Sequence, residues 1–286
     1  KYFMQQVKIF IDLTRLNKPI GFMLLFWPCS WGLSYALLIN QNLKLFLYYS
    51  FLFFLGSVLM RSAGCIFNDI VDKDYDKKVL RTKKRPLASG KVSIKKAFIY
   101  VFMLCLIAFF VLMQFNILTI FLGLSSMILA FSYPFMKRFT YWPQLFLGFT
   151  FNWGIIMAWA AMIDNVTLAI IYLYIAAIFW TLGYDTIYGA QDVVDDEIIG
   201  LKSTSIKFKK HLKKFVTFSY LISSIIIIYL FSEKIGMNFF TVTFLFFILT
   251  LVYQVIKLNK KSAQNYLDCF KINNYSGFVL FLAILI

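Results

Sequence analysis

Long apolar runs recur along the whole chain, and they restrict its fold more than any other feature of the sequence. As helices, runs of about 20 apolar residues cross the roughly 30 Å hydrocarbon core of a bilayer. Lipid offers no partner to backbone N–H and C=O groups, so such spans must be helical. The runs lie near residues 19–39, 44–66, 95–114, 116–134, 144–162, 167–189, 213–232, 236–256 and 274–286. The sequence therefore predicts an all-α fold, a polytopic membrane bundle of about nine transmembrane helices, as a single domain over residues 1–286.

Positive charge is divided unevenly between the two sets of loops. The sequence has 29 Lys and Arg residues against 13 Asp and Glu residues, a formal net charge of +16. Of the 29, 26 precede the first span or lie in alternate loops, whereas the opposite loops carry only Lys44 and Lys234. By the positive-inside rule, the N-terminus and the basic loops face the cytoplasm. Membrane lipids are the expected surroundings, and no nucleic-acid partner is needed to explain the charge.

Most acidic residues gather in two short stretches, each at the cytoplasmic end of a predicted span. Nine of the 13 acids are Asp69, Asp72, Asp74 and Asp76 in the first stretch and Asp185, Asp192, Asp195, Asp196 and Glu197 in the second. On a helix, Asn68, Asp72 and Asp76 share one face at i, i+4 and i+8. Asp192 and Asp196 repeat the i, i+4 spacing. Like charges so placed destabilise a helix, so both stripes need a compensating charge.

A hard divalent cation would supply that charge. Mg²⁺ prefers oxygen ligands and is usually shared between one or two carboxylates and a substrate phosphate. The predicted ligands are Asn68, Asp69, Asp72, Asp76, Asp192 and Asp196. The alternative is two solvated acidic caps paired with loop lysines. Arg61 lies inside a span, where an arginine is costly and marks a functional contact, here with a phosphate or carboxylate, unless it reaches the membrane surface instead.

At these residues the sequence resembles the UbiA superfamily of intramembrane prenyltransferases. The stretch Asn68–Asp76 matches the family motif N-D-x-x-D-x-x-x-D, and Tyr188–Asp196 matches Y-x-x-x-D-x-x-D-D. A following G-x-K-S-T is present as Gly200–Thr204. The stretches Arg15–Gly21 and Tyr133–Arg138 are similar to the 4-hydroxybenzoate polyprenyltransferase branch. One position departs from that branch, because Val194 stands where another acid is often found.

The resemblance implies Mg²⁺-dependent transfer of a polyprenyl chain from its diphosphate to the ring carbon ortho to the hydroxyl of 4-hydroxybenzoate, in ubiquinone biosynthesis. Mg²⁺ would act as a Lewis acid on the diphosphate. The residues expected to stabilise its departure are Arg61, Arg81, Lys137 and Lys202. Asp185 is the candidate for orienting or deprotonating the phenol, and Arg15 or Arg138 for binding the acceptor carboxylate. Tyr188 is placed with the substrate-binding residues, and the segment from Asp74 to Lys96 is expected to cover the site.

The sequence alone leaves two other hypotheses about function open. A member of the same superfamily could use another acceptor, such as haem, a naphthoate or a lipid. A cation transporter is disfavoured, because transporter sites lie near the bilayer midplane, whereas these acids follow span ends. The resemblance favours a bacterial cytoplasmic membrane, with the mitochondrial inner membrane as the alternative, and the oligomeric state is left open.

Overall fold

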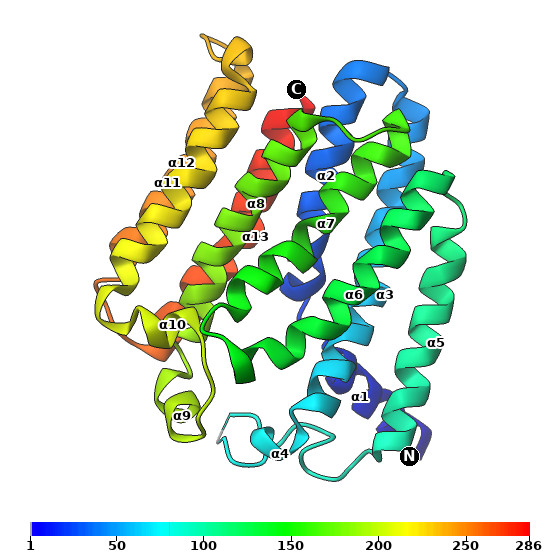
Figure 1. The fold of residues 1–286 in the computed structure, drawn as a ribbon, viewed down its shortest axis with the longest axis vertical. Helices are drawn as coiled ribbons and strands as arrows, with labels where there is room; N and C mark the ends of the chain where they lie inside the picture. The colour runs from blue at the N-terminus through cyan, green and yellow to red at the C-terminus, as the bar shows by residue number, and fades with distance from the viewer. Residues whose placement is uncertain (1, 80) are drawn as a thin grey trace.

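The computed structural model describes residues 2–79 and 81–286, and within them every regular element is a helix (Figure 1). The expected all-α fold is confirmed. The helices are α1 (Tyr2–Thr14), α2 (Ile20–Asn40), α3 (Leu43–Val71), α4 (Lys73–Asp76), α5 (Ile94–Leu112), α6 (Ile117–Phe139), α7 (Pro143–Ile163), α8 (Leu168–Gly189), α9 (Val193–Ile198), α10 (Thr204–Lys207), α11 (Leu212–Leu230), α12 (Phe239–Lys257) and α13 (Ala263–Leu285), with 3-10 turns at Lys209–His211 and Ser232–Lys234.

Eight helices among the described residues are long and apolar enough to cross a membrane, namely α2, α3, α5, α6, α7, α8, α11 and α12. The ninth long helix, α13, begins at Ala263 rather than near residue 274. Its first half is too polar to be recognised as a span, yet part of that polarity is buried. The Asn273 side chain accepts a hydrogen bond from Trp180 Nε1 and donates one to Gln254 Oε1. Satisfied polar groups of this kind hold helices together inside a bundle.

A helix also forms before the first predicted span, where the sequence is short and mixed. Helix α1 packs against α3, and its Leu13 is buried with Ile66 and Leu87 in a small second core. Phe10 of the same helix meets Tyr100 of α5 edge to face. Amphipathic segments become helical when such an apolar face has something to cover. Helix α1 therefore closes one side of the bundle next to α3 and α5.

The main core is built from the long helices α2, α7, α8, α11, α12 and α13 and from the first half of α3. Helix α2 packs on both α7 and α13, so the first and last long helices of the chain meet. Two tight turns are made in the same way, because Gln41 and Asp164 take left-handed backbone conformations (φ 54° and 56°) just after α2 and α7. The two hairpins α2–α3 and α7–α8 are thus similar.

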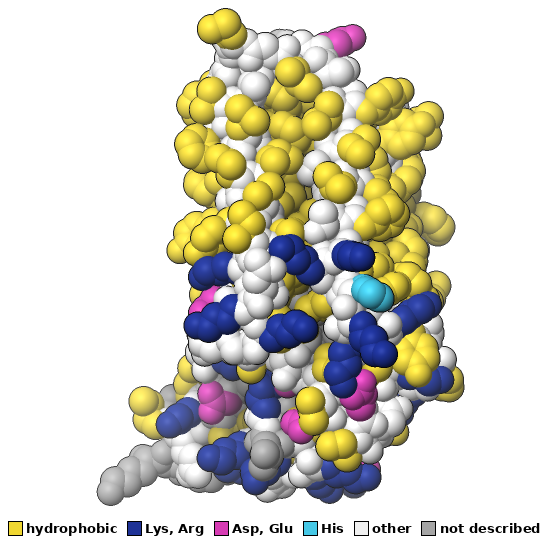
Figure 2. Space-filling model, turned by 90° about the vertical axis from the view of Figure 1, so that its left-hand side faces the viewer, with side chains coloured by type: hydrophobic (Ala, Val, Ile, Leu, Met, Phe, Trp, Pro, Cys, Tyr) yellow, Lys and Arg dark blue, Asp and Glu magenta, His cyan; other side chains and the backbone are white. Residues whose placement is uncertain are grey.

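The short helices α4, α9 and α10 lie together at one end of the bundle, which is called the polar end below (Figure 1). The side of the molecule drawn in Figure 2 shows Lys and Arg side chains gathered toward this end, whereas apolar side chains cover the rest. A broad apolar band bordered by charge is the surface expected of a helical bundle in lipid. Both acidic motifs lie at the polar end, after α3 and after α8.

Candidate active site

The two acidic motifs have the same local geometry. Asp72 ends α3 and precedes α4, with φ −94° and ψ 4°, and Asp192 follows α8 and precedes α9, with φ −110° and ψ 6°. The amide of Asp76 donates to Asp72 O at 2.8 Å, and that of Asp196 donates to Asp192 O at 2.9 Å. Each motif therefore places two carboxylates one helical turn apart, as the i, i+4 spacing predicts.

One cavity of about 1340 Å³ runs inward from the polar end and is lined by residues of both motifs. From the acidic motifs come Asn68, Asp72, Asp76, Asp185, Tyr188, Asp192 and Asp196. Basic lining residues include Arg15, Arg61, Arg81, Arg85, Lys137 and Lys202. Deeper in the bundle the wall is apolar, with Leu52, Phe53, Leu112, Phe115, Met157 and Trp153. A polar mouth and an apolar interior suit a ligand with a charged head and a hydrocarbon tail.

Basic side chains hold every carboxylate of the first motif that is buried. Asp72, 1% exposed, pairs with Lys137 and lies 3.7 Å from Arg138. Asp76 accepts a 2.8 Å hydrogen bond from Arg85 Nη1. Burial raises the pKa of Asp72, while the Lys137 ammonium acts in the opposite direction. Charges removed from water in this way need partners, and here the partners are lysine and arginine.

Arg81 connects the segment after α4 to the second motif. Its Nε and Nη2 donate to the two carboxylate oxygens of Asp192 at 2.9 and 2.5 Å, and Nη1 donates to Tyr188 Oη at 3.1 Å. The guanidinium also lies 5.6 Å from the centre of the Tyr188 ring. Burial raises the pKa of Asp196 to about 6, and the negative charge of Asp192 adds to this rise. The segment that follows the first motif is thus joined to the second motif through one bidentate arginine contact.

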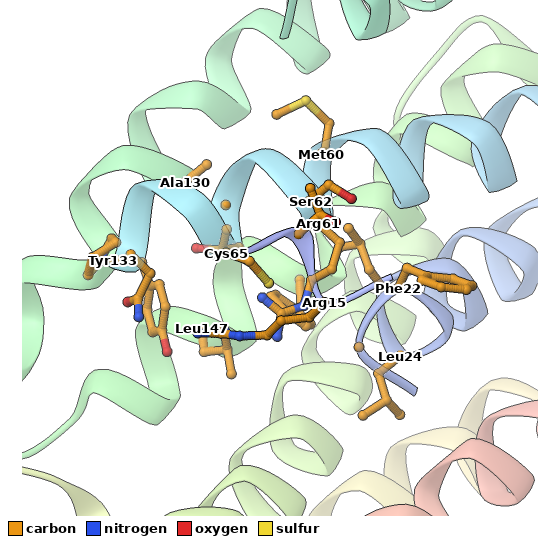
Figure 3. Close-up of a pocket in the computed structure, with 18 of the residues that line it drawn as sticks. Arg15, Phe22, Leu24, Met60, Arg61, Ser62, Cys65, Ala130, Tyr133 and Leu147 are labelled. Carbon is orange, nitrogen blue, oxygen red and sulfur yellow. The ribbon is translucent and has the colours of Figure 1, made fainter. Parts of the chain in front are cut away.

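The inner part of the cavity contains a second pair of charged groups, Arg61 on α3 and Asp185 on α8. Both line the cavity, and Arg61 is close enough to act electrostatically on Asp185. Figure 3 shows Arg61 among the lining residues, with Arg15 and Tyr133. The Arg61 guanidinium lies 5.5 Å from the centre of the Phe151 ring, and its Nε has no hydrogen-bond partner among the described residues. Arg61 therefore keeps donor capacity that the described residues do not satisfy.

Comparison with known proteins identifies this arrangement. The sequence pattern of the UbiA prenyltransferase family matches residues 25–276, which include both acidic motifs and most of the residues that line the cavity. The chain belongs to the UbiA prenyltransferase family.

Relatives at two levels of similarity agree with this membership. A 4-hydroxybenzoate octaprenyltransferase of Vibrio vulnificus is 38% identical over 283 residues, which cover 99% of this chain and 98% of that protein. A mitochondrial 4-hydroxybenzoate polyprenyltransferase of Caenorhabditis elegans is 45% identical over 212 residues, covering 74% of this chain and 59% of that protein. The chain thus spans little more than half the length of the mitochondrial relative.

Solved structures of the UbiA family share the fold. The apo structure of a UbiA homolog from Aeropyrum pernix K1 matches with a TM-score of 0.76 at 23% identity, covering 91% of this chain and 96% of that one. A UbiA homolog from Archaeoglobus fulgidus, bound to GPP and Mg²⁺, matches with a TM-score of 0.70 at 19% identity, covering 97% and 99%. These structures establish that the bundle is a UbiA-type membrane bundle.

Most of the residues expected from the sequence meet in the cavity, but two do not. Asp69 and Arg138 are absent from its described lining. Asp69 points away into a contact with Arg15 and Arg85. Arg138 lies behind Asp72, where Nη2 donates to Val71 O at the end of α3 and the guanidinium covers the Tyr75 ring at 5.1 Å. Arg138 is therefore wrongly placed to bind a substrate in this cavity.

Sequence reasoning also missed some cavity residues. Arg85 was not among the residues expected at the site, yet it lines the cavity and pairs with two acids of the first motif. Phe151 lies beside Arg61, and nothing in the sequence singles it out among 34 phenylalanines. Tyr133 also lines the cavity, but sequence reasoning assigned it no role beyond its place in the stretch Tyr133–Arg138. The segment from Asp74 to Lys96, apart from residue 80, contributes Tyr75, Asp76, Val79, Arg81, Thr82, Lys84, Arg85, Pro86 and Lys91 to the lining.

The donor set fits a hard divalent ion. Its groups are carboxylate and amide oxygens, the ligands that Mg²⁺ prefers. Asp72 Oδ1 is buried and has no hydrogen-bond partner among the described residues, which leaves a lone pair open to a cation. Within the described residues no three acidic, His or Cys side chains already converge on one point. The carboxylates are instead turned toward Arg and Lys, so metal binding requires Asp72 and Asp192 to exchange partners.

Proposed function

We propose that this protein transfers a polyprenyl chain from a polyprenyl diphosphate to the ring carbon ortho to the hydroxyl of 4-hydroxybenzoate, with Mg²⁺ as cofactor. The observation that carries the proposal is the single cavity that joins the two acidic motifs at its mouth to an apolar interior. It is supported by the octaprenyltransferase relative that matches over nearly its whole length. The Archaeoglobus homolog bound to GPP and Mg²⁺ supports the choice of donor and metal.

The diphosphate head is assigned to the mouth of the cavity. Asn68, Asp72, Asp76, Asp192 and Asp196 are the proposed Mg²⁺ ligands. Bound Mg²⁺ would neutralise the diphosphate and make it a better leaving group. Arg81, Lys137 and Lys202 line the same region, and their fixed positive charges stabilise the negative charge that develops on the departing oxygens. Arg81 reaches the diphosphate by releasing one of its two bonds to Asp192.

The acceptor is assigned to the inner pair of charges. Arg61 lies seven residues before Asn68 on α3, about 10 Å along the helix axis, so it is too deep for the diphosphate and suits the acceptor carboxylate. We transfer that role to it from Arg15 and Arg138. Asp185 lies near Arg61 and is assigned as the group that orients the phenol and accepts the proton. Tyr188, between the mouth and Asp185, contributes the face of its ring to the substrate.

The proposed reaction is a substitution on the aromatic ring, with diphosphate as the leaving group. The allylic C1–O bond breaks, the electron pair leaves with the diphosphate, and the ring carbon ortho to the phenol forms the new C–C bond. The proton of that carbon passes to Asp185. Water would quench the allylic cation, and the segment after α4 shields the mouth through Val79, which is buried and lines the cavity. The apolar interior accommodates the first part of the prenyl chain.

An in vitro assay tests the proposal. Purified protein in lipid nanodiscs, given a polyprenyl diphosphate, 4-hydroxybenzoate and Mg²⁺, should form the 3-prenylated product and lose turnover when the metal is chelated. Asp192→Asn should also lose turnover, because it removes a proposed metal ligand. A naphthoate, haem and a glycerol lipid serve as competing acceptors. Faster turnover with any of these, and none with 4-hydroxybenzoate, would reject the proposed acceptor while keeping the reaction class.

The polar end is proposed to face the cytoplasm, or the matrix in a mitochondrion. The lysines and arginines of this end support that orientation through the positive-inside rule. Ser89 is exposed in the segment that covers the cavity. In inside-out vesicles a membrane-impermeant thiol reagent should label Ser89→Cys, and in right-side-out vesicles it should not. Labelling only in right-side-out vesicles would invert the proposed topology.

A further inference from the structure

Asp69 differs from the other acids of the first motif. It lies on α3 and is 1% exposed, and it is not among the described residues that line the cavity. One of its oxygens, Oδ1, accepts hydrogen bonds from Arg15 Nη2 at 2.5 Å and from Arg85 Nη1 at 3.1 Å. Those arginines come from distant parts of the chain, and both line the cavity. A single buried carboxylate therefore holds two guanidiniums at the wall of the site.

A metal ion is poorly suited to this position. A dication at Asp69 would stand in contact with two guanidiniums, whose like charge opposes it. Asp72 and Asp76 are different, because both line the cavity, and Asp72 Oδ1, although 3.7 Å from Arg138 Nη2, accepts no hydrogen bond among the described residues. The spacing that places Asp69 in the motif thus puts its carboxylate on the side of α3 that faces the arginines, not the ligand.

Arg85 shows what Asp69 contributes during ligand binding. Its Nη1 is shared between Asp69 Oδ1 and Asp76 Oδ2, at 3.1 and 2.8 Å. If Asp76 turns to a metal ion, Asp69 is the carboxylate that still holds Arg85. Among residues 2–79 and 81–286, Arg15 forms an ion pair only with Asp69, and its backbone takes the left-handed conformation, φ 58°, that directs it from the end of α1. Without the carboxylate the two guanidiniums would repel each other.

We propose that Asp69 is a positioning residue that fixes Arg15 and Arg85 as a pair of cationic contacts for the diphosphate, and that it is not a metal ligand. The inference rests on the proposed function for the identity of the diphosphate ligand. A guanidinium donates in a planar fork that matches phosphate oxygens. Because Asp69 holds both guanidinium groups, they are already placed to bind phosphate oxygens before the substrate binds.

The test separates anion binding from metal binding by direct titration. Binding of geranyl diphosphate at saturating Mg²⁺ is measured by calorimetry, and binding of Mn²⁺ without diphosphate is measured by electron paramagnetic resonance. For Asp69→Asn we expect a Kd for geranyl diphosphate raised roughly ten- to hundredfold, the range for hydrogen bonds to charged groups, with Mn²⁺ binding unchanged. The matched variant Asp72→Asn should weaken Mn²⁺ binding. Asp69→Asn weakening Mn²⁺ binding as Asp72→Asn does, or leaving both titrations unchanged, would overturn the proposal.

Two further variants keep the proposal testable if Asp69→Asn does not fold. Arg15→Gln and Arg85→Gln leave the carboxylate in place, and each should raise the Kd for geranyl diphosphate without changing Mn²⁺ binding. Unchanged diphosphate binding in both would also overturn it. These titrations need no acceptor. Wild-type protein that binds geranyl diphosphate but does not prenylate 4-hydroxybenzoate would reject the proposed acceptor and leave the role of Asp69 to be decided by the binding data.

Discussion

Replacing Arg81 should lower the rate of prenyl transfer far more than it lowers the stability of the protein. The side chain makes two bonds to Asp192 and one to Tyr188, but it is 42% exposed. Ion pairs exposed to this extent contribute up to about 1 kcal/mol to folding. Arg81→Gln should therefore lower the free energy of unfolding by no more than about 1 kcal/mol.

The expected loss of activity is much larger. Removing one fixed donor from a site where negative charge develops lowers kcat on the order of 10²- to 10³-fold. Because Arg81 occupies both oxygens of Asp192, its removal should not raise the Mg²⁺ concentration that gives half-maximal activity. Arg81→Lys keeps the charge but loses the planar fork, and we expect an intermediate kcat.

The assay measures prenyl transfer over a Mg²⁺ titration, together with thermal unfolding in the same nanodiscs. Lys83→Gln is the matched control, because Lys83 is exposed in the same segment and is not among the described lining residues. Its kcat should equal that of the wild type. An unchanged kcat for Arg81→Gln would show that Arg81 does not face the departing diphosphate. A strong fall in stability would show that its contacts are structural.

Two other substitutions test the packing and the inner pair. A Cβ on Gly32 would lie 2.5 Å from the backbone oxygen of Ile155, so Gly32→Ala should destabilise the protein by about 1–3 kcal/mol. Gly56→Ala, whose Cβ meets no described atom within 4 Å, should be neutral or stabilising by up to about 1 kcal/mol; equal melting temperatures for the two variants would contradict the α2–α7 packing. Asp185→Asn should lower kcat roughly 10²- to 10⁴-fold with geranyl diphosphate binding unchanged, and weakened binding instead would place Asp185 at the diphosphate.

The transmembrane helices were predictable because a backbone in the hydrocarbon core must satisfy its own hydrogen bonds, as a helix does. The first predicted span, 19–39, is found as Ile20–Asn40, and the sixth, 167–189, as Leu168–Gly189. Helix α13 was predicted to start too late, since Asp268 and Asn273 lower its hydropathy. Asn273 is fully buried and hydrogen-bonded within the bundle. Hydropathy cannot distinguish such a satisfied polar group from one in water.

Site prediction succeeded where spacing along one helix sets the geometry. The i, i+4 pairs of both motifs lie one turn apart, and both motifs line one cavity. Site prediction was less complete where an acidic side chain pairs with a residue from another segment of the chain. Arg85 and Arg81 reach acids 16 and 111 residues away, respectively. Arg138 was assigned to a substrate from charge and motif position, but it turns back to Val71 O.

By itself, the sequence determined that the chain is a membrane bundle and that two oxygen-rich motifs follow α3 and α8, because backbone hydrogen bonding in lipid and helical periodicity are local properties. Only the tertiary structure decided which way each charged side chain faces. Asp69 and Asp72 are three residues apart, yet one is enclosed by arginines and the other opens to the cavity. That difference depends on segments brought together by packing between α1, α3 and the loop before α5, which no pattern along α3 contains.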